Sequence, residues 1–276
     1  MDWLWLLLLG FGTGAYGVLV GAGGGFILGP ALLIFFDLDK EAAAGTALAL
    51  VAANTISGAP VYLRMGRVDR RSGVLFALAA IPGSVIGAFA LVAVSGSIFR
   101  ILFGLLLIAL GIQMLVAPRI SQGPSAPKKS TSRVGRMVRT RRITTDDGQV
   151  FEYSFNEGFA TAFNVVLGFI SSFFGTGGGF LRTPILVAVF RFPVHVAAAT
   201  SIFALAFYTT AGAATHAALG HVEWWPTFVW AGIGLVAGGQ VGARLAGRVK
   251  GVWILRLLLV VVLALGVTLL IEGVRG

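Results

Sequence analysis

Gly-Ala-Gly-Gly-Gly-Phe, residues 21–26, interrupts a long apolar stretch, and Gly-Thr-Gly-Gly-Gly-Phe, residues 175–180, interrupts another one 154 residues later. The match continues without a gap, and Pro30 pairs with Pro184 at the same offset. Two halves of the chain therefore carry the same unit, and each unit has a glycine break inside a membrane-length segment. This arrangement is typical of transporters built from internal repeats, whose site lies where the broken segments meet.

The composition is that of a membrane protein. Of 276 residues, 57% are hydrophobic and 12% are charged, and the mean hydropathy is +0.91. A soluble domain carries about 25% charged residues, so we expect the lipid bilayer to surround this chain. The net charge of +10 does not indicate a nucleic-acid partner, because the basic residues cluster in loops beside apolar segments. Cysteine is absent, which excludes disulfides and cysteine metal sites.

Apolar segments alternate with short loops along both halves. A helix needs about 20 apolar residues to cross the hydrocarbon of a bilayer. The candidates are, in approximate bounds, 3–20, 26–36, 42–63, 73–94, 98–117, 156–174, 179–190, 194–219, 225–246 and 252–272. We therefore predict an all-α polytopic membrane protein with about 8–10 membrane segments. Each repeat should contain a glycine-broken or re-entrant segment, because 26–36 and 179–190 are too short to cross unaided.

The basic loops predict the orientation and the division of the chain. Residues 64–72 and 118–150 are both rich in arginine and are separated by two spans, so both should lie in the cytoplasm. We expect a first transmembrane repeat, 1–117, a basic cytoplasmic linker, 118–150, and a second transmembrane repeat, 151–276, in the cell (plasma or inner) membrane. With an odd number of passes in each half, the second repeat is inverted relative to the first. One miscounted short segment would make the repeats parallel.

The linker is rich in proline and serine at its start and basic further on. That composition predicts a flexible, solvated tether held near anionic headgroups. A short alternation of apolar and polar residues at 149–155 leaves a strand and an amphipathic lead-in to the next helix both open.

The glycine runs predict an anion site made of backbone. Irregular backbone inside a membrane survives only where it faces protein or a water-filled cavity. A triple-glycine turn that opens into a short helix presents free N–H groups and the positive end of the helix dipole. Close helix packing is the alternative explanation of the glycines, and their duplication in register favours a site. The candidate residues are Gly23, Gly24, Gly25, Gly177, Gly178 and Gly179.

Arg182 is a second candidate for binding an anion. It follows Gly175 by seven residues inside an apolar segment, where the first copy has Leu28. An arginine within the membrane is costly and usually marks a pathway or a paired site. We place no carboxylate inside a span, and an unpaired guanidinium suits the oxygen atoms of a sulfonate or sulfite. The alternative is that Arg182 extends to the cytoplasmic face.

Polar residues follow the glycines on the next segment of each half. Thr46 and Thr200 occupy equivalent positions, and so do Asn54 and Tyr208. Ser201 follows Thr200. A threonine in a membrane helix often bonds only to its own turn, so the prediction that these residues line a ligand depends on their duplication.

His216 is a candidate proton relay, because it lies near the outer end of its span and histidine titrates near neutral pH. A histidine at headgroup level without such a role is the alternative. His195 and His221 are expected in loops, and the three histidines are too dispersed to predict a metal site. No cofactor is expected.

The duplicated motif resembles that of the TauE/SafE sulfite exporter family, also called the toluene sulfonate uptake permease group. The resemblance rests on Gly-x-Gly-Gly-Gly-Phe, then proline, then Ala-x-Gly-Thr (43–46) or Ala-x-Ala-Thr-Ser (197–201), and covers nearly all of the chain outside 118–150. It implies secondary transport of sulfur-containing anions such as sulfite, thiosulfate or organosulfonates, and two halves with the glycine motifs at the centre. The first copy has Gly45-Thr46-Ala47 where the second has Ala199-Thr200-Ser201, so the halves should contribute unequally.

The expected function is therefore secondary transport of a small sulfur-containing anion by alternating access at a site between the repeats. An anion channel with the same central site is the alternative. An enzyme is not expected, because no Ser/His or Asp/Asp pair and no His-Glu metal spacing lies at a plausible depth. The particular anion, the direction of transport, the coupling ion and the oligomeric state are left open, with a homodimer as one option.

Overall fold

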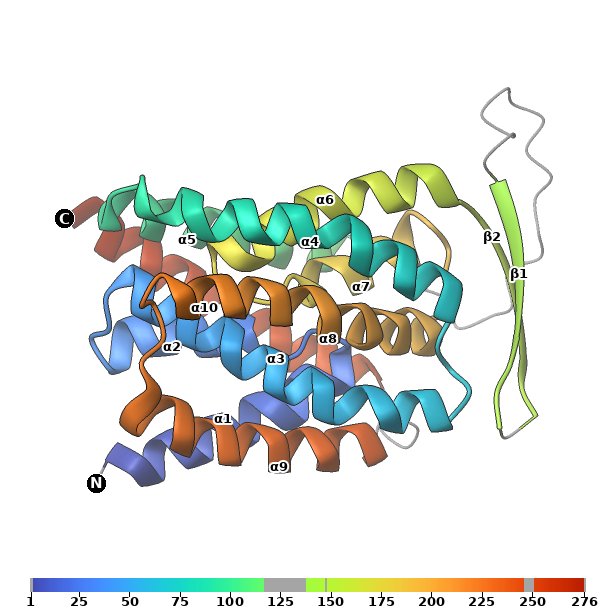
Figure 1. Ribbon diagram of the computed structural model, residues 1–276, viewed down its shortest axis with the longest axis horizontal. Helices are drawn as coiled ribbons and strands as arrows, with labels where there is room; N and C mark the ends of the chain where they lie inside the picture. The colour runs from blue at the N-terminus through green and yellow to red at the C-terminus, as the bar shows by residue number, and fades with distance from the viewer. Residues whose placement is uncertain (1, 117–137, 147, 246–250, 276) are drawn as a thin grey trace.

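The structure is a computed structural model, which describes residues 2–116, 138–146, 148–245 and 251–275. The chain folds mostly as helices that lie side by side, with a two-stranded hairpin at one end (Figure 1). In chain order the elements are α1 (Asp2–Val20), α2 (Gly25–Phe35), α3 (Lys40–Arg64), α4 (Arg70–Val92), α5 (Gly96–Val116), β1 (Val138–Thr144), β2 (Val150–Asn156), α6 (Glu157–Phe173), α7 (Gly179–Ala188), α8 (Val194–Ala218), the π-helical turn η2 (Trp224–Phe228), α9 (Val229–Leu245) and α10 (Gly251–Arg275).

Among the described residues, five helical segments are long and apolar enough to cross a membrane. They are Trp3–Val20, Lys40–Arg64, Arg70–Val92, Val194–Ala218 and Trp224–Leu245. Shorter apolar helices accompany them, namely Gly25–Phe35, Gly96–Ile112, Glu157–Phe173 and Gly179–Ala188. The fold therefore agrees with a polytopic helical membrane protein, and the larger count of about 8–10 membrane segments stays a prediction.

The hairpin β1–β2 corrects the prediction of an all-α fold. Its strands are antiparallel, with Val138 opposite Asn156. Apolar and polar residues alternate along β2, which is the period of a strand with one face against a core, and the ring of Tyr153 lies 4.4 Å from that of Phe192. Residues 150–155 of the stretch 149–155, for which the sequence left a strand and an amphipathic lead-in both open, therefore form a strand. The predicted linker ends in this hairpin, and its residues 118–137 lie outside the described residues.

Asp69 holds the hairpin to the helices. Its carboxylate caps α4 by accepting from the Ser72 N–H at 3.1 Å and accepts from the Tyr153 hydroxyl at 2.8 Å. Arg141 of β1 lies between Asp69 and Glu157 and forms ion pairs with both. Burial raises the pKa of Tyr153, and the charge of Asp69 raises it further. These side chains therefore act as one polar cluster beneath the strands.

The loops gather at two ends of the bundle, which we call the hairpin face and the distal face. At the hairpin face the Asp146 N–H donates to the Met65 carbonyl at 3.3 Å. At the distal face Lys40 Nζ donates to the Leu91 carbonyl at 3.1 Å. Loop 64–72 and the hairpin therefore share one face, whereas the assignment of that face to the cytoplasm stays a prediction. Helix α1 starts and α10 ends away from the strands (Figure 1).

Two helix pairs, α1–α2 and α6–α7, enter the bundle from opposite faces. Helix α2 turns back along α1, so that the ring of Phe26 lies 6.3 Å from that of Tyr16. Helix α7 turns back along α6, and Phe190 after α7 lies 5.9 Å from Phe159 at the start of α6. The α1–α2 pair therefore opens toward the distal face and the α6–α7 pair toward the hairpin face. The tips of both pairs carry the glycine runs.

The long helices α3 and α8 pack against each other at the centre and run antiparallel. Thr46, near the start of α3, accepts from the N–H of Glu223, beyond the end of α8, at 2.8 Å. Thr200, near the start of α8, accepts from the N–H of Asp69, beyond the end of α3, at 3.0 Å. Around this pair α1 packs on α9, α6 on α4, and α5 on α10.

Glycine allows close approach at the α1–α9 and α4–α6 contacts. A Cβ atom on Gly14 would lie 2.8 Å from the Cα atom of Leu235, and one on Gly168 would lie 2.9 Å from that of Ala80. Small residues at such crossings let helix backbones touch, as membrane helices often do. Close packing therefore explains these glycines, which lie outside the two triple-glycine runs for which it is the alternative explanation.

Candidate functional site

The predicted glycine breaks are present at both positions. We call Gly21–Gly25 the first glycine turn and Gly175–Gly179 the second. Helix α2 begins after Gly24, which has a left-handed φ of 97°, and α7 begins after Gly178, whose φ is 69°. Glycine adopts such values without the steric cost that a side chain imposes. Each turn therefore ends in a short helix, as the sequence predicts.

The two glycine turns meet at the centre of the protein. A Cβ atom on Gly25 would lie 2.8 Å from the carbonyl oxygen of Gly175, and one on Gly179 would lie 2.8 Å from the Cα atom of Ala22. The rings of Phe26 and Phe180, which follow the turns, stack at 5.5 Å. Both turns are buried, so the described conformation holds them away from both faces.

Each turn leaves backbone N–H groups free at the start of a helix. Within the described part of the chain, no hydrogen bond is donated by the N–H groups of Gly24, Gly25, Phe26, Gly178, Gly179 and Phe180. Helix N-termini always leave such donors, and aligned peptide dipoles add partial positive charge there. Free N–H groups of this kind suit an anion, and binding of one at either turn stays a prediction.

The turn carbonyls, in contrast, are held by side chains that the sequence singled out. Asn54 Nδ2 donates to the Gly23 carbonyl at 3.0 Å, and the Tyr208 hydroxyl donates to the Gly177 carbonyl. Ser201 Oγ donates to the carbonyl of Gly21 at 2.8 Å. These bonds fix the turns while their N–H groups stay free. Contact of Asn54, Tyr208 and Ser201 with a ligand stays a prediction.

In the described structure, Thr46 and Thr200 do not bond to the glycine turns. Their hydroxyl oxygens accept the N–H groups of Glu223 and Asp69, in loops at opposite faces. The structure therefore places them where the two halves join, with a bond to a loop and not to a glycine turn. Their role as ligands stays a prediction, and the described bonds give them a structural one.

Arg182 is fully buried in α7 and belongs to a polar cluster at the second glycine turn. Its Nε donates to Asn164 Oδ1 of α6 at 2.7 Å, and its Cζ lies 4.6 Å from the centre of the Tyr208 ring. Its Nη1 and Nη2 atoms have no hydrogen-bond partner among the described residues. The alternative that Arg182 extends to the surface is therefore wrong, because none of the side chain is exposed.

Three buried hydroxyl groups beside the second glycine turn also lack partners in the described structure. They belong to Ser171, Ser172 and Thr176. A Cβ atom on Gly178 would lie 3.2 Å from the Cβ atom of Ser171, which shows how close these groups are to the turn. Buried donors without partners are costly and usually mark a missing ligand or water. Sequence reasoning missed these hydroxyls and Asn164, because serine and asparagine in an apolar helix give no signal without a known partner.

His216 is buried and contacts a second histidine. Its Nε2 lies 2.9 Å from the Ser172 carbonyl, and its Nδ1 lies 3.0 Å from Nδ1 of His221. The prediction that the three histidines are dispersed is therefore wrong for this pair. Burial lowers the pKa of His221, while Glu41 and Asp39 oppose that shift. Among the described residues no three metal-ligating side chains come together.

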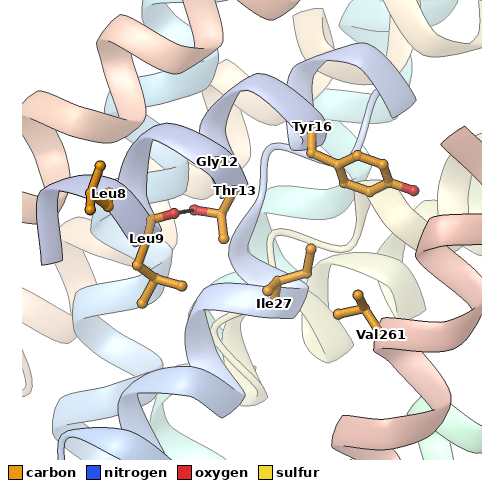
Figure 2. Close-up of a pocket in the computed structure, with 7 residues that line it drawn as sticks. All are labelled: Leu8, Leu9, Gly12, Thr13, Tyr16, Ile27 and Val261. Atoms are coloured by element: carbon orange, nitrogen blue, oxygen red, sulfur yellow. Dashed lines mark hydrogen bonds between the residues drawn. The ribbon is translucent and has the colours of Figure 1, made fainter. Parts of the chain in front are cut away.

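A separate pocket of about 330 Å³ lies between α1, α2 and α10 (Figure 2). Its lining residues are Leu8, Leu9, Gly12, Thr13, Tyr16, Ile27 and Val261. The lining is mostly apolar, and the Thr13 hydroxyl donates to the Leu9 carbonyl at 2.7 Å. This pocket offers no charge to an anion, so it is not the candidate site.

The family model described as "Sulfite exporter TauE/SafE" matches residues 6–269. The chain is 29% identical over 281 residues to "Probable membrane transporter protein YunE" of Bacillus subtilis (strain 168), with 99% of each chain covered. It is 29% identical over 242 residues to a "Probable membrane transporter protein" of Xylella fastidiosa (strain 9a5c), which covers 87% of this chain and 82% of that one. No solved structure matches the chain.

Proposed function

Because the chain belongs to the sulfite exporter TauE/SafE family of membrane transporters, we propose that it carries a small sulfur-containing anion by secondary transport. The chain is a multi-pass membrane protein and not an enzyme. The proposed substrates are sulfite, thiosulfate or an organosulfonate. The cell membrane is the proposed location, with the arginine-rich hairpin face in the cytoplasm.

Arg182 carries the proposal. Moving the charge of Arg182 out of water costs several kcal/mol even after the protein relaxes. Asn164 Oδ1 accepts the hydrogen of Arg182 Nε and leaves the two terminal nitrogens without a partner among the described residues. The terminal Nη1 and Nη2 atoms, without partners among the described residues, form the donor fork that matches two oxygens of an oxyanion. An anion bound there would satisfy the fork and neutralise the charge at once.

The second glycine turn would complete the same site. The N–H groups of Gly178, Gly179 and Phe180, free within the described structure, lie at the start of the helix that carries Arg182. A sulfonate or sulfite has three oxygens, so its remaining oxygen could accept from these N–H groups or from the Ser171 hydroxyl. Charge-assisted hydrogen bonds are about twice as strong as neutral ones. An uncharged solute would leave Arg182 unpaired, which favours anions.

Inverted repeats and alternating access are the proposed mechanism. The bonds Thr46–Glu223 and Thr200–Asp69 are related by the repeat offset of 154 residues and lie at opposite faces. The antiparallel α3 and α8 and the opposed α1–α2 and α6–α7 pairs support a two-fold axis across the helices. Rocking of one repeat against the other would expose the central turns to one face at a time.

An anion channel with the same site is the competing proposal. A channel needs a continuous path, whereas the two glycine turns press on each other and the Val51 side chain covers both. The Val51 Cγ1 atom would lie 2.8 Å from a Cβ atom on Gly23 and 2.6 Å from one on Gly177. This packing favours a carrier that must change conformation. A homodimer stays an untested prediction.

Uptake into proteoliposomes tests the proposal. Labelled sulfite, thiosulfate and sulfoacetate should enter saturably with the wild type and show counterflow, which a channel does not support. Arg182→Ala should reduce uptake to the level of empty liposomes, while Leu28→Ala, the equivalent change beside the first glycine turn, should retain it. Equal uptake by wild type and Arg182→Ala would refute a role for Arg182, and uptake of none of the anions would refute the substrate class.

A further inference from the structure

The helices α3 and α8 end in the same motif, which places two side chains together. At the end of α8, Gly220 has a φ of 77° and the His221 N–H donates to the His216 carbonyl at 2.9 Å. This is a Schellman motif, in which the residue after the glycine lies beside the residue one turn back. His216 and His221, five positions apart, are neighbours for this reason.

The end of α3 has the same backbone and different side chains. Gly66 has a φ of 66°, and the Arg67 N–H donates to the Tyr62 carbonyl at 3.4 Å. The Tyr62 hydroxyl donates to the Val18 carbonyl at 2.9 Å, at the end of α1. Tyr62 and Arg67 correspond to His216 and His221 at the repeat offset. Neither tyrosine nor arginine ordinarily changes charge near neutral pH.

His216 contacts the carbonyl of Ser172 as Tyr62 contacts the equivalent carbonyl of Val18, but the histidine ring can take up a proton. His216 Nε2 lies 2.9 Å from the Ser172 carbonyl, which also accepts the Gly175 N–H of the second glycine turn. A carbonyl only accepts, so Nε2 bears the hydrogen and Nδ1 of the neutral ring is an acceptor. His221 Nδ1 must then donate to it. An added proton on His221 can pass along this bond to His216 without breaking the pair.

The surroundings of the two rings differ in a way that suits proton entry. His221 is half-buried, and the charged groups acting on it are Glu41, Asp39 and Lys40 at the start of α3. His216 is fully buried, and His221 is the titratable group that acts on it within the described structure. His221 is therefore the ring that protons from the distal face can reach, and among the described residues it is the titratable group that contacts the buried His216.

From this geometry we infer that His216 and His221 bind the coupling proton of the transporter, taken up at the distal face and held beside the second glycine turn. The inference rests on the proposed function, because a bound anion near Arg182 would stabilise the charge on His216. By reciprocity the proton would strengthen anion binding by the same factor. The equivalent Tyr62–Arg67 pair gives the hairpin face no such site.

A pH gradient across proteoliposomes tests the coupling, with thiosulfate as the probe and the membrane potential clamped at zero. One coupled proton lets a gradient of one pH unit support about tenfold accumulation, because a proton is then worth 1.36 kcal/mol. The double variant His216→Tyr with His221→Arg copies the pair of α3, so the same backbone should accept it. It should equilibrate thiosulfate without accumulating it, whereas His195→Gln, at the other end of α8, should accumulate it as the wild type does.

A titration without transport separates this inference from the proposed function. In protein labelled with [¹⁵N]histidine, the rings of His216 and His221 should titrate together, at a pH below the usual histidine range because burial lowers the pKa of His221. His221→Gln should leave His216 neutral. A His216 ring that stays neutral throughout, with and without thiosulfate, would overturn the proton site. Joint titration with no thiosulfate uptake would instead overturn the proposed substrate. Accumulation by the double variant equal to that of the wild type would also refute the coupling.

Discussion

The two glycine turns share a backbone and differ in polarity. Gly24 and Gly178 both cap a short helix with a positive φ, and both turns leave N–H groups free in the described structure. The polar residues beside the second turn, Asn164, Ser171, Thr176 and Arg182, are matched in the first half by Gly10, Gly17, Ala22 and Leu28. The two turns therefore have similar backbones, and among the described residues a charged side chain lies beside the second turn and not beside the first.

This difference favours the second turn as the proposed anion site. The nearest atoms to the first turn belong to backbone and to uncharged side chains, whereas the second turn lies beside a buried cation whose Nη atoms have no partner among the described residues. Burial makes an unpaired charge costly, so the second turn is the place where an anion gains most. The following experiments compare the two turns, beginning with the largest expected effect.

Arg182→Leu makes the second turn resemble the first. Loss of the charge and of two or more charge-assisted bonds, each worth about 1.5–3 kcal/mol, should weaken thiosulfate binding at least about 100-fold. Thiosulfate at 100 times the wild-type Kd should stabilise the wild type by about 2.7 kcal/mol, and the same concentration should stabilise the variant by about 0.4 kcal/mol or less. Thermal unfolding in detergent measures both. Leu28→Ala is the control, and an unchanged thiosulfate effect in Arg182→Leu would contradict the assigned site.

Asn164→Ala removes the acceptor of Arg182 Nε. The buried donor left without a partner should cost about 1–3 kcal/mol of stability. In an Arg182→Leu background the same change should cost much less, because the bond is already absent, and a double-mutant cycle isolates the difference. Equal costs in both backgrounds would show that Asn164 does not act through Arg182.

Tyr208→Phe and Asn54→Ala remove equivalent bonds to the turn carbonyls. Each change should cost about 0.5–1.5 kcal/mol of stability. Only Tyr208→Phe should also weaken anion binding, by roughly threefold to tenfold on the same energy scale, because Tyr208 lies under Arg182 and holds Gly177. Thiosulfate binding and thermal unfolding, measured on both variants, compare the two bonds. Equal binding losses would mean that the first turn contributes as much as the second.

Ser201→Ala should have the smallest effect. It gives α8 the alanine that α3 has at position 47 and removes the bond from Ser201 Oγ to the Gly21 carbonyl. Thr183 Oγ1 still donates to that carbonyl at 3.3 Å, so stability should fall by less than about 1 kcal/mol. Transport should change less than in Tyr208→Phe. A loss as large as that of Arg182→Leu would place Ser201 in direct contact with the ligand.

Local features of the sequence predicted much of the fold and identified several residues of the candidate site. The glycine turns, the short helices behind them and the long apolar helices follow from glycine's freedom at positive φ and from segment length, which need no knowledge of distant residues. Arg182 was identifiable because a charge in an apolar segment is rare. The strand at 150–156 was left open, since its burial depends on Tyr153 reaching Asp69 and Phe192.

The chain by itself determined where the backbone breaks, which segments suit a membrane and which half carries an arginine within an apolar segment. Only the tertiary structure decided what these parts contact. Asn164 meets Arg182 because α6 and α7 turn back on each other, and Thr46 and Thr200 join loops of the opposite half because α3 and α8 run antiparallel. The physical reason is range: dihedral preference and hydrophobic length act within a few residues, whereas a hydrogen bond between helices depends on how the whole bundle packs.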